Sequence, residues 1–417
     1  MPSFLRRKSA RSFAVPAVVA MLGTFAATAA NASEKVLYSF RGGSDGASPY
    51  AGVITDKAGN LYGTTTTGGT AGPGCQSSGC GVLFKLAPGG TESVLYAFQG
   101  GNDGIGPYGS LLMDKAGDFY GVTGGGGNGG GWGTVFKLTP EGTESVLYSF
   151  QGGSDGRFPF APLIADRKGN LYGTTDEGGN YIGSDCSEFG CGTVFKVQPD
   201  GNKITLYEFQ GGSDGALSYG GVIADSAGNL YGTTGAGGDG GCGGGGCGTV
   251  FKLAPDGTET ILYAFRGDTD GDEPEAGLVM DNGGNLYGTT FLGGAGSAGT
   301  VFEVSPSGAE TILYAFKRGT DGANPESALI MDKSGNLYGT TYNGGSNGCR
   351  KSGCGTVFEL APDGTETVLY AFRKHQGQYP HGQYPAGGLL LGKSGLLYGT
   401  ATAGGPDNVG VVFSVKQ

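Results

Sequence analysis

A hexapeptide motif, Asn-Leu-Tyr-Gly-Thr-Thr, recurs seven times along this 417-residue chain in identical or altered form. The copies begin at Asn60, Asp118, Asn170, Asn229, Asn285, Asn336 and Leu396. Successive copies are 51 to 60 residues apart, and each interval holds several β-type runs. Such repeats are typical of propeller blades, whereas a parallel β-helix has coils of about 20 to 30 residues. The pattern predicts an all-β propeller, and the clues to its function lie in what differs between blades.

Each unit contains four short apolar runs separated by turn signals, which predicts a four-stranded antiparallel meander. In the second unit the runs are Ser110 to Asp114, Phe119 to Thr123, Thr134 to Leu138 and Ser145 to Phe150. Compact glycine-bearing turns join the first run to the second and the third to the fourth. The other connections are longer and rich in glycine. Because strand direction alternates in a meander, these long loops should all lie on one face.

The two ends of the chain carry complementary parts of one blade. Val36 to Phe40 resembles the fourth run of a unit, whereas the last unit ends with a third run, Gly410 to Val415. We therefore expect the N-terminal strand to complete the seventh blade, which closes the ring and removes open sheet edges. The predicted domains are a secretory signal peptide at residues 1–32 and a seven-bladed propeller at residues 33–417.

The repeated segments resemble a known family. Gly-Asn-Leu-Tyr-Gly-Thr-Thr, Gly-Thr-Val-Phe-Lys-Leu-Ala-Pro-Asp-Gly-Thr-Glu-Thr and Leu-Tyr-Ala-Phe are similar to the GloVer tandem repeats of bacterial "choice-of-anchor" surface proteins. The resemblance extends over residues 33–417. It implies an extracellular protein and supplies no catalytic residues that could be transferred to this chain.

The N-terminal segment has the composition of a bacterial secretory signal peptide. A basic stretch from Arg6 to Arg11 precedes an apolar stretch from Phe13 to Ala30, and a small-x-small cleavage signal ends at Ala32. No later apolar run has the roughly 18 residues needed to span a bilayer. We therefore expect a secreted or periplasmic protein without a membrane span, and we expect it to be a monomer.

The predicted mature chain is strongly acidic. The full sequence has 26 basic and 37 acidic residues, and removal of the four basic residues before Ala32 leaves a net charge of about −15. Such a surface repels nucleic acid and anionic lipid, and no basic cluster opposes this trend. The expected partner is an extracellular glycan or protein. No sequence motif predicts a cofactor.

All eight cysteines fall into four Cys-x4-Cys pairs, each in the loop between the second and third runs of a unit. The pairs are Cys75/Cys80, Cys186/Cys191, Cys242/Cys247 and Cys349/Cys354. An even count, short local spacing and an export signal predict four disulfides within these loops. Metal binding is the alternative, although two sulfurs per unit fall short of the four ligands of a structural zinc site.

The second cysteine position is replaced in the other three units. It is Trp132, the only tryptophan of the chain, in the second unit, and Ala298 and Val409 in the fifth and seventh. Two interpretations stay open. The substitute is an apolar plug in place of the disulfide or, for Trp132, a stacking surface for a sugar ring or another flat ligand.

An aspartate lies in the loop after the fourth run of six units. These residues are Asp45, Asp103, Asp155, Asp214, Asp270 and Asp321. An aspartate between glycines commonly bonds to its own loop backbone, so one interpretation is structural. The other is an acidic crown that attracts cations. Its densest segment, Asp268 to Asp272, points to calcium but lacks the bidentate glutamate of an EF-hand loop, and we predict no metal site.

The position just before the first run of each unit changes in type around the ring. It is Tyr50, Tyr108, Phe160, Tyr219, Glu275, Glu326 and Ala386 in successive units. Structural repetition does not explain such a change, so we predict a polarised binding surface near the mouth of the channel. Aromatic faces beside carboxylates suit carbohydrate. Packing of each aromatic ring against the next blade is the structural alternative.

The sequence favours a ligand-binding or protein-interaction module over an enzyme. It contains no Gly-x-Ser-x-Gly motif and no phosphate loop. The alternative is a polysaccharide or lactone lyase or hydrolase that uses Glu275 and Glu326 as an acid/base pair. The only two histidines, His375 and His381, lie in one irregular loop and are a second possible source of catalysis. A near-duplication within that loop gives it a non-catalytic explanation.

Overall fold

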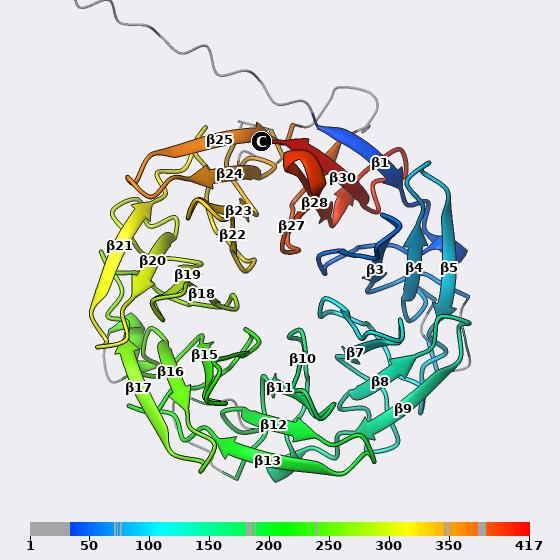
Figure 1. Cartoon of the computed structure of the whole chain (residues 1–417), viewed down its shortest axis with the longest axis horizontal. Helices are drawn as coiled ribbons and strands as arrows, with labels where there is room; N and C mark the ends of the chain where they lie inside the picture. The colour runs from blue at the N-terminus through cyan, green and yellow to red at the C-terminus, as the bar shows by residue number, and fades with distance from the viewer. Residues whose placement is uncertain are drawn as a thin grey trace, which may run out of the picture. The chain divides into compact units, whose positions relative to one another are not determined.

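A computed structural model describes residues 34–417 except 71, 73, 76, 181–185, 187–188, 239–240, 346–347, 350–351 and 374–380. These residues form seven four-stranded antiparallel sheets and one two-stranded ribbon. The sheets follow one another around a central channel like the blades of a propeller (Figure 1). The predicted all-β, seven-bladed architecture is therefore confirmed. The predicted signal peptide lies outside the described residues.

Each blade has four strands, from the channel to the outer edge of the ring (Figure 1). The innermost strands are β2 (Ile54–Thr55), β6 (Leu112–Met113), β10 (Ile164–Ala165), β14 (Ile223–Ala224), β18 (Val279–Met280), β22 (Ile330–Met331) and β27 (Leu390–Leu391). The second strands are β3 (Leu61–Thr65), β7 (Phe119–Thr123), β11 (Leu171–Thr175), β15 (Leu230–Thr234), β19 (Leu286–Thr290), β23 (Leu337–Thr341) and β28 (Leu396–Ala401). The third strands are β4 (Val82–Leu86), β8 (Thr134–Leu138), β12 (Thr193–Val197), β16 (Thr249–Leu253), β20 (Thr300–Val304), β24 (Thr356–Leu360) and β30 (Val411–Lys416). The outermost strands are β5 (Glu92–Ala97), β9 (Glu144–Ser149), β13 (Lys203–Glu208), β17 (Glu259–Ala264), β21 (Glu310–Ala315), β25 (Glu366–Ala371) and β1 (Lys35–Ser39).

A few short elements lie between the blade strands. The ribbon pairs β26 (Gly382–Gln383) with β29 (Ala403–Gly404). Four 3-10 turns are η1 (Gly43–Asp45), η2 (Gly153–Asp155), η3 (Cys242–Gly244) and η4 (Lys393–Gly395). Across the described ranges, no helix has the length and apolar character that a membrane crossing requires.

The sequence predicts the middle strands of a blade better than its edges. In the second blade β7 and β8 have the predicted bounds, whereas the innermost strand is shorter than the predicted Ser110 to Asp114. β6 pairs with β7 on one side only, and the preceding Ser110 lines the channel instead of extending the sheet. The outermost strand is shifted by one residue, to Glu144–Ser149.

The ring closes by pairing the N-terminal strand with the C-terminal strand. β1 lies antiparallel to β30, with Lys35 opposite Ser414 and Ser39 opposite Val411. The seventh blade therefore takes its three inner strands from the C-terminal end of the chain and its outermost strand from the N-terminal end (Figure 1). This pairing confirms the predicted closure and covers the outer edge of β30.

A pair of phenylalanine rings joins each blade to the next. The residue that follows the outermost strand packs edge-to-face on a third-strand phenylalanine of the next blade, with ring centroids 5.0 to 5.2 Å apart. The pairs are Phe40–Phe84, Phe98–Phe136, Phe150–Phe195, Phe209–Phe251, Phe265–Phe302, Phe316–Phe358 and Phe372–Phe413. All of these rings are fully buried, and burial stabilises the fold by about 1.5–3 kcal/mol per ring. The closing interface between the seventh and first blades has the same pair as the others.

The contacts of the hexapeptide explain why it occupies the second strand. Leu61 is buried in the core between blades. The Tyr62 hydroxyl donates a 3.0 Å hydrogen bond to the carboxylate of Asp56 in the preceding turn. A Cβ atom at Gly63 would lie 2.7 Å from the ring of Phe84, so a larger residue would displace that ring. The motif thus connects the inner turn of a blade to its core.

Four disulfides close the loops between the second and third strands, as predicted. They join Cys75 to Cys80, Cys186 to Cys191, Cys242 to Cys247 and Cys349 to Cys354. The second cysteine of every pair is fully buried. Cys242, Cys247 and Asp272 have possible ligand atoms within 4.8 Å of one another, but the disulfide removes the thiolates that a metal ion needs.

Candidate functional site

The seven residues that vary around the ring meet at one cavity. We call them the rim residues: Tyr50, Tyr108, Phe160, Tyr219, Glu275, Glu326 and Ala386. All of them line a single cavity of about 640 Å³ in the central channel. Small residues form much of the remaining wall. A Cβ atom at Gly52 would lie 2.4 Å from the carbonyl oxygen of Gly388, so the segments that lead into β2 and β27 approach too closely for a side chain at Gly52.

A residue with left-handed backbone geometry lies two positions before each rim residue. These residues are Ser48, Gly106, Phe158, Leu217, Glu273, Asn324 and Tyr384, with φ between 55° and 64°. The carbonyl of each accepts a hydrogen bond from the residue after the second strand, as Phe158 does from the Asp176 N–H (3.1 Å). Bulky residues rarely adopt this geometry, because their Cβ approaches a carbonyl oxygen. Strain of this kind concentrates at functional sites.

Three aromatic rim residues form a continuous arc. The Tyr50 and Tyr108 rings meet edge-to-face with centroids 5.8 Å apart, and the Tyr108 and Phe160 rings do so at 5.0 Å. Tyr50 and Tyr108 still expose 39% and 37% of their surface. Tyr219 instead packs against the backbone of Gly235. The rings of the arc therefore pack against rings of neighbouring blades and still present aromatic surface for a ligand.

Glu275 and Glu326 form an acidic sector of the same cavity. The Tyr50 hydroxyl donates a 3.2 Å hydrogen bond to Glu326 Oε2. Burial raises the pKa of Glu326 from its ordinary 4.5 to about 7, and the bond from Tyr50 opposes part of this rise. Burial, together with repulsion from Glu273 and Glu326, raises the pKa of Glu275 to about 7. Near neutral pH both carboxyls can therefore donate or accept a hydrogen bond.

Two residues beside the rim lie outside the sequence predictions. Asp176 is buried, and its Oδ1 has no hydrogen-bond partner in the described part of the chain. Burial and the nearby Glu177 raise the pKa of Asp176 to about 7. Tyr342 stacks on Tyr384 with ring centroids 5.0 Å apart. Asp176 and Tyr342 both follow the hexapeptide, where residue type varies between blades as it does at the rim, and this signal could have found them.

The aspartates for which the sequence leaves a structural role and an acidic crown both open lie in six separate loops. Each residue stays in its own loop and accepts a hydrogen bond from a tyrosine on the outermost strand before it. Asp155 accepts from the Tyr148 hydroxyl (2.8 Å) and from the Gln151 N–H (2.7 Å). Asp45, Asp103, Asp214, Asp270 and Asp321 accept from their tyrosines at 2.7 to 2.9 Å. None of the six is among the described residues that line the central cavity.

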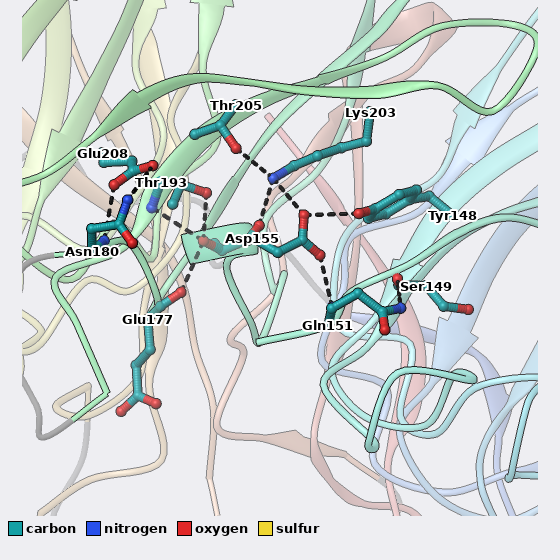
Figure 2. A network of polar contacts seen from close by, with 11 residues as sticks. Tyr148, Ser149, Gln151, Asp155, Glu177, Asn180, Thr193, Lys203, Thr205 and Glu208 are labelled. Atoms are coloured by element: carbon teal, nitrogen blue, oxygen red, sulfur yellow. Dashed lines mark hydrogen bonds and ion pairs between the residues drawn. The ribbon is translucent and has the colours of Figure 1, made fainter. Parts of the chain in front are cut away.

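The third blade carries a lysine where the other six blades carry a glutamate, namely Glu34, Glu92, Glu144, Glu259, Glu310 and Glu366. Lys203 Nζ donates hydrogen bonds to Asp155 Oδ1 at 2.9 Å and to Thr205 Oγ1 at 2.7 Å. Figure 2 shows both contacts as dashed lines. At the corresponding interfaces, burial and the loop aspartate raise the pKa of the glutamate to about 7 at Glu144, Glu259, Glu310 and Glu366. The Lys203 ammonium group thus replaces the protonatable carboxyl found at these four interfaces, and either group limits the net charge buried between blades.

Trp132 lines a second cavity of about 460 Å³, formed by loops of the second and third blades. The Arg157 guanidinium lies 4.7 Å from the Trp132 ring centroid and 3.4 Å from that of Phe189, and it forms an ion pair with Glu177. Trp132 also packs against the core cluster between the second and third blades. It therefore fills space in the protein and forms part of a cavity wall. The equivalent Ala298 is fully buried.

His381 lies at the closure of the ring. Its Nδ1 is 2.7 Å from Glu34 Oε2, and the Gly382 N–H donates a 3.1 Å hydrogen bond to Glu34 Oε1. The Tyr370 hydroxyl donates to the same carboxylate at 3.0 Å. His381 thus anchors the segment that precedes β1. His375 lies outside the described residues, so the structure does not place the two histidines together.

Comparison with protein families identifies the chain. The sequence model of the Gloeobacter/Verrucomicrobia repeat matches residues 21–244 and 241–417. The chain belongs to this repeat family. The match confirms the resemblance seen in the sequence. No curated protein sequence matches this Gloeobacter/Verrucomicrobia repeat protein.

Solved structures with the same fold share little sequence with this Gloeobacter/Verrucomicrobia repeat protein. The extracellular domain of a putative hybrid two-component system from B. thetaiotaomicron has a TM-score of 0.58 at 11% identity, over 91% of this chain and 39% of that one. The extracellular domain of a putative one-component system from the same organism has a TM-score of 0.53 at 10% identity, over 92% of this chain and 40% of that one. A putative 6-phosphogluconolactonase from Bacteroides uniformis has a TM-score of 0.52 at 16% identity, over 85% of this chain and 91% of that one. This chain spans about two fifths of the two extracellular domains. At such identities the likeness establishes the fold alone.

Proposed function

We propose that this protein is an exported module that binds carbohydrate at the mouth of its central channel. The observation that carries the proposal is the convergence of all seven rim residues on one cavity. An aromatic arc lies on one side of that cavity and protonatable carboxyls lie on the other. Its volume of about 640 Å³ falls within the usual range of small-molecule sites, about 300–1,000 Å³.

Carbohydrate fits this division of the cavity because a sugar ring has both apolar and polar faces. Its C–H groups can stack on Tyr108 and Phe160, while its hydroxyls find hydrogen-bond partners in Glu275 and Glu326. A purely apolar ligand would leave the carboxyls unsatisfied. A metal ion alone would leave the aromatic arc unused, and an anion would be repelled by the carboxylates.

The four disulfides support export of the protein. Disulfides persist in oxidising compartments such as the periplasm and the extracellular space. The extracellular domains among the solved structures of the same fold agree with this location. We place the mature protein, beginning after Ala32, in the periplasm or outside the cell.

A hydrolytic enzyme is the second candidate, and the raised pKa values of Glu275 and Glu326 favour it. A carboxyl that titrates near neutral pH can act as a general acid while its neighbour acts as a base. Such a pair could cleave a glycoside or lactone held against the aromatic arc. The two candidates share the site and differ in whether bound sugar is turned over.

A glycan array probed with the purified mature protein tests the binding proposal. We expect binding that is lost in Tyr108→Ala and Phe160→Ala and retained in Ile204→Ala. Ile204 is a suitable control because it is 37% exposed on β13 and is not among the described residues of the cavity wall. The same glycans are then incubated with the protein and analysed for cleavage. Turnover that disappears in Glu275→Gln or Glu326→Gln would replace the binding proposal with the enzymatic one.

A further inference from the structure

A line of stacked side chains connects the central cavity with the second cavity. The arc of rim residues ends at Phe160, whose ring lies parallel to that of Phe158, 5.9 Å between centroids and 11° between planes. Phe158 in turn meets Trp132 edge-to-face at 5.7 Å. The Arg157 guanidinium then covers Trp132 at 4.7 Å and Phe189 at 3.4 Å. The contacts run without a break from Tyr50 in one cavity to Phe189 in the other.

Phe158 is the link in this line. Only the third blade has aromatic residues both at the rim and two positions before it. The repeated blade architecture therefore does not require an aromatic ring at the position of Phe158. Its φ of 57° is a conformation that a bulky side chain seldom adopts. This geometry holds its ring between Phe160, which lines the central cavity, and Trp132, which lines the second one.

The second cavity offers polar contacts without unpaired charge. Arg157 is the one charged residue among the described residues of its wall, and Glu177 neutralises it. The side chains of Gln151 and Asn180 lie in the same wall, where amides can donate to and accept from hydroxyl groups. Phe189, 45% exposed, adds an apolar face. These properties match an uncharged, hydroxyl-rich ligand.

We propose that the two cavities are subsites for a linear, uncharged polysaccharide, whose chain follows the aromatic line from the channel to Trp132. The inference rests on the proposed carbohydrate binding and extends it to a ligand class. A linear polymer fits because stacking surface continues between the cavities and no single cavity contains it all. An acidic polysaccharide fits poorly, because the chain is acidic overall and Arg157 is already paired. Proline-rich peptides also bind to aromatic grooves, but they have no hydroxyl groups to bond to the amides and carboxyls of the two cavities. A proline-rich peptide is therefore included in the experiment as the alternative ligand.

The single tryptophan provides a direct reporter of the second subsite. The mature protein is titrated with cello- and laminari-oligosaccharides from the disaccharide to the octasaccharide. Binding is followed by isothermal titration calorimetry and, in parallel, by Trp132 fluorescence. We expect the shortest sugars to bind without changing the fluorescence. Sugars long enough to reach Trp132 should change it and bind about tenfold more tightly, the gain expected from additional stacking contacts.

Phe189→Ala tests the second subsite without disturbing the core, because Phe189 is largely exposed. It should weaken binding of the long sugars about tenfold and leave the short ones unaffected, whereas Ile204→Ala should change neither. Unaltered circular dichroism verifies the fold of both variants. Affinity that does not depend on the length of the sugar, or Trp132 fluorescence that never changes, overturns the two-subsite inference. If the short sugars still bind, the proposed function stands. A disaccharide that already changes the fluorescence also overturns it.

Two further outcomes concern the ligand class. Polyproline is titrated alongside the sugars, and binding of polyproline in their place contradicts the assignment to polysaccharide. Failure of every oligosaccharide to bind contradicts the inference and the proposed function together.

Discussion

The hydroxyl of Tyr50 in the first blade donates a hydrogen bond to Glu326 in the sixth blade, with 3.2 Å between the oxygens. The seventh blade lies between these two blades in the ring (Figure 1), and its rim residue is Ala386. The small methyl group of Ala386 leaves room for the bond. The one blade that presents neither an aromatic ring nor a carboxyl therefore allows its two neighbours to connect across the mouth of the channel.

Tyr50→Phe removes the donor of this bond. Because the bond favours the charged form of Glu326, its loss should raise the pKa of Glu326 further. Ala386→Leu should have the same effect by occupying the intervening space, whereas Tyr108→Phe removes a different rim hydroxyl and serves as the control. Carbon-13 NMR titration of glutamate carboxyls measures the shift. Unchanged Glu326 titration in both of the first two variants would show that the bond does not form in solution.

The raised carboxyl pKa values predict that stability decreases as pH rises from about 4.5 to about 7. Glu275 and Glu326 have an ordinary pKa of 4.5 when unfolded and a pKa of about 7 when folded. Within this window the folded protein binds more protons than the unfolded chain, so raising the pH favours unfolding. Glu326→Gln removes one such group and should flatten the dependence of Tm on pH.

Asp56→Asn is the matched control for this pH dependence. Although burial opposes it, hydrogen bonding from Asn60 and Tyr62 lowers the pKa of Asp56 below its ordinary 3.8. The stability from Asp56 is therefore present above pH 3.8 and is lost only as the pH falls through the lower, folded value. Asp56→Asn should therefore lower Tm by the same amount at every pH between 4.5 and 7. An unchanged slope in Glu326→Gln would show that Glu326 titrates normally in the folded protein.

Lys203 should be important for the interface between the second and third blades. Its side chain is buried, and Lys203→Gln leaves the Asp155 carboxylate without a cation. We expect a loss of about 3 kcal/mol in the free energy of unfolding, as for other buried ion pairs that lose one partner. Lys168→Gln, in an exposed turn, is the control. Lys203→Glu recreates the pairing of the other interfaces and should be tolerated better at pH 5 than at pH 8. Equal stability at both pH values would contradict this interpretation of the interfaces.

The closing interface should be as strong as the others. Phe40→Ala and Phe98→Ala make the same substitution at equivalent positions, one at the closure and one between the first two blades. Both rings are fully buried, so each substitution should cost about 3–5 kcal/mol in chemical denaturation. A much smaller cost for Phe40→Ala would indicate that the ring is open in solution.

The blade architecture could be predicted because it depends on local, repeated signals. The hexapeptide recurs at blade spacing, the two chain ends supply complementary strands, and each Cys-x4-Cys segment is short enough to identify its own disulfide. Aspartates of the Asp155 type could be interpreted in two ways from sequence. The structure shows their tyrosine partners, seven residues earlier in the chain, in every loop of this type.

The candidate site could be predicted only in part. The change of residue type around the ring identified the rim residues, because that signal lies in the sequence. The bond between Tyr50 and Glu326 could not be predicted, since it joins residues 276 positions apart on two blades that are not consecutive in the ring. The raised pKa of Asp176 follows from its burial, and the aromatic line through Phe158 follows from the loop geometry. Sequence spacing reports neither property.

Isothermal titration calorimetry with laminari- and cello-oligosaccharides tests the central claim most directly. Wild type, Tyr108→Ala, Phe160→Ala and Ile204→Ala are compared at neutral pH, and the sugars are recovered and analysed for cleavage. The account predicts intact sugars, unchanged affinity in Ile204→Ala, and affinity reduced about tenfold or more in each aromatic variant. Sugar binding that is indifferent to both aromatic variants, or sugars recovered as cleavage products, would contradict a carbohydrate-binding module centred on the rim.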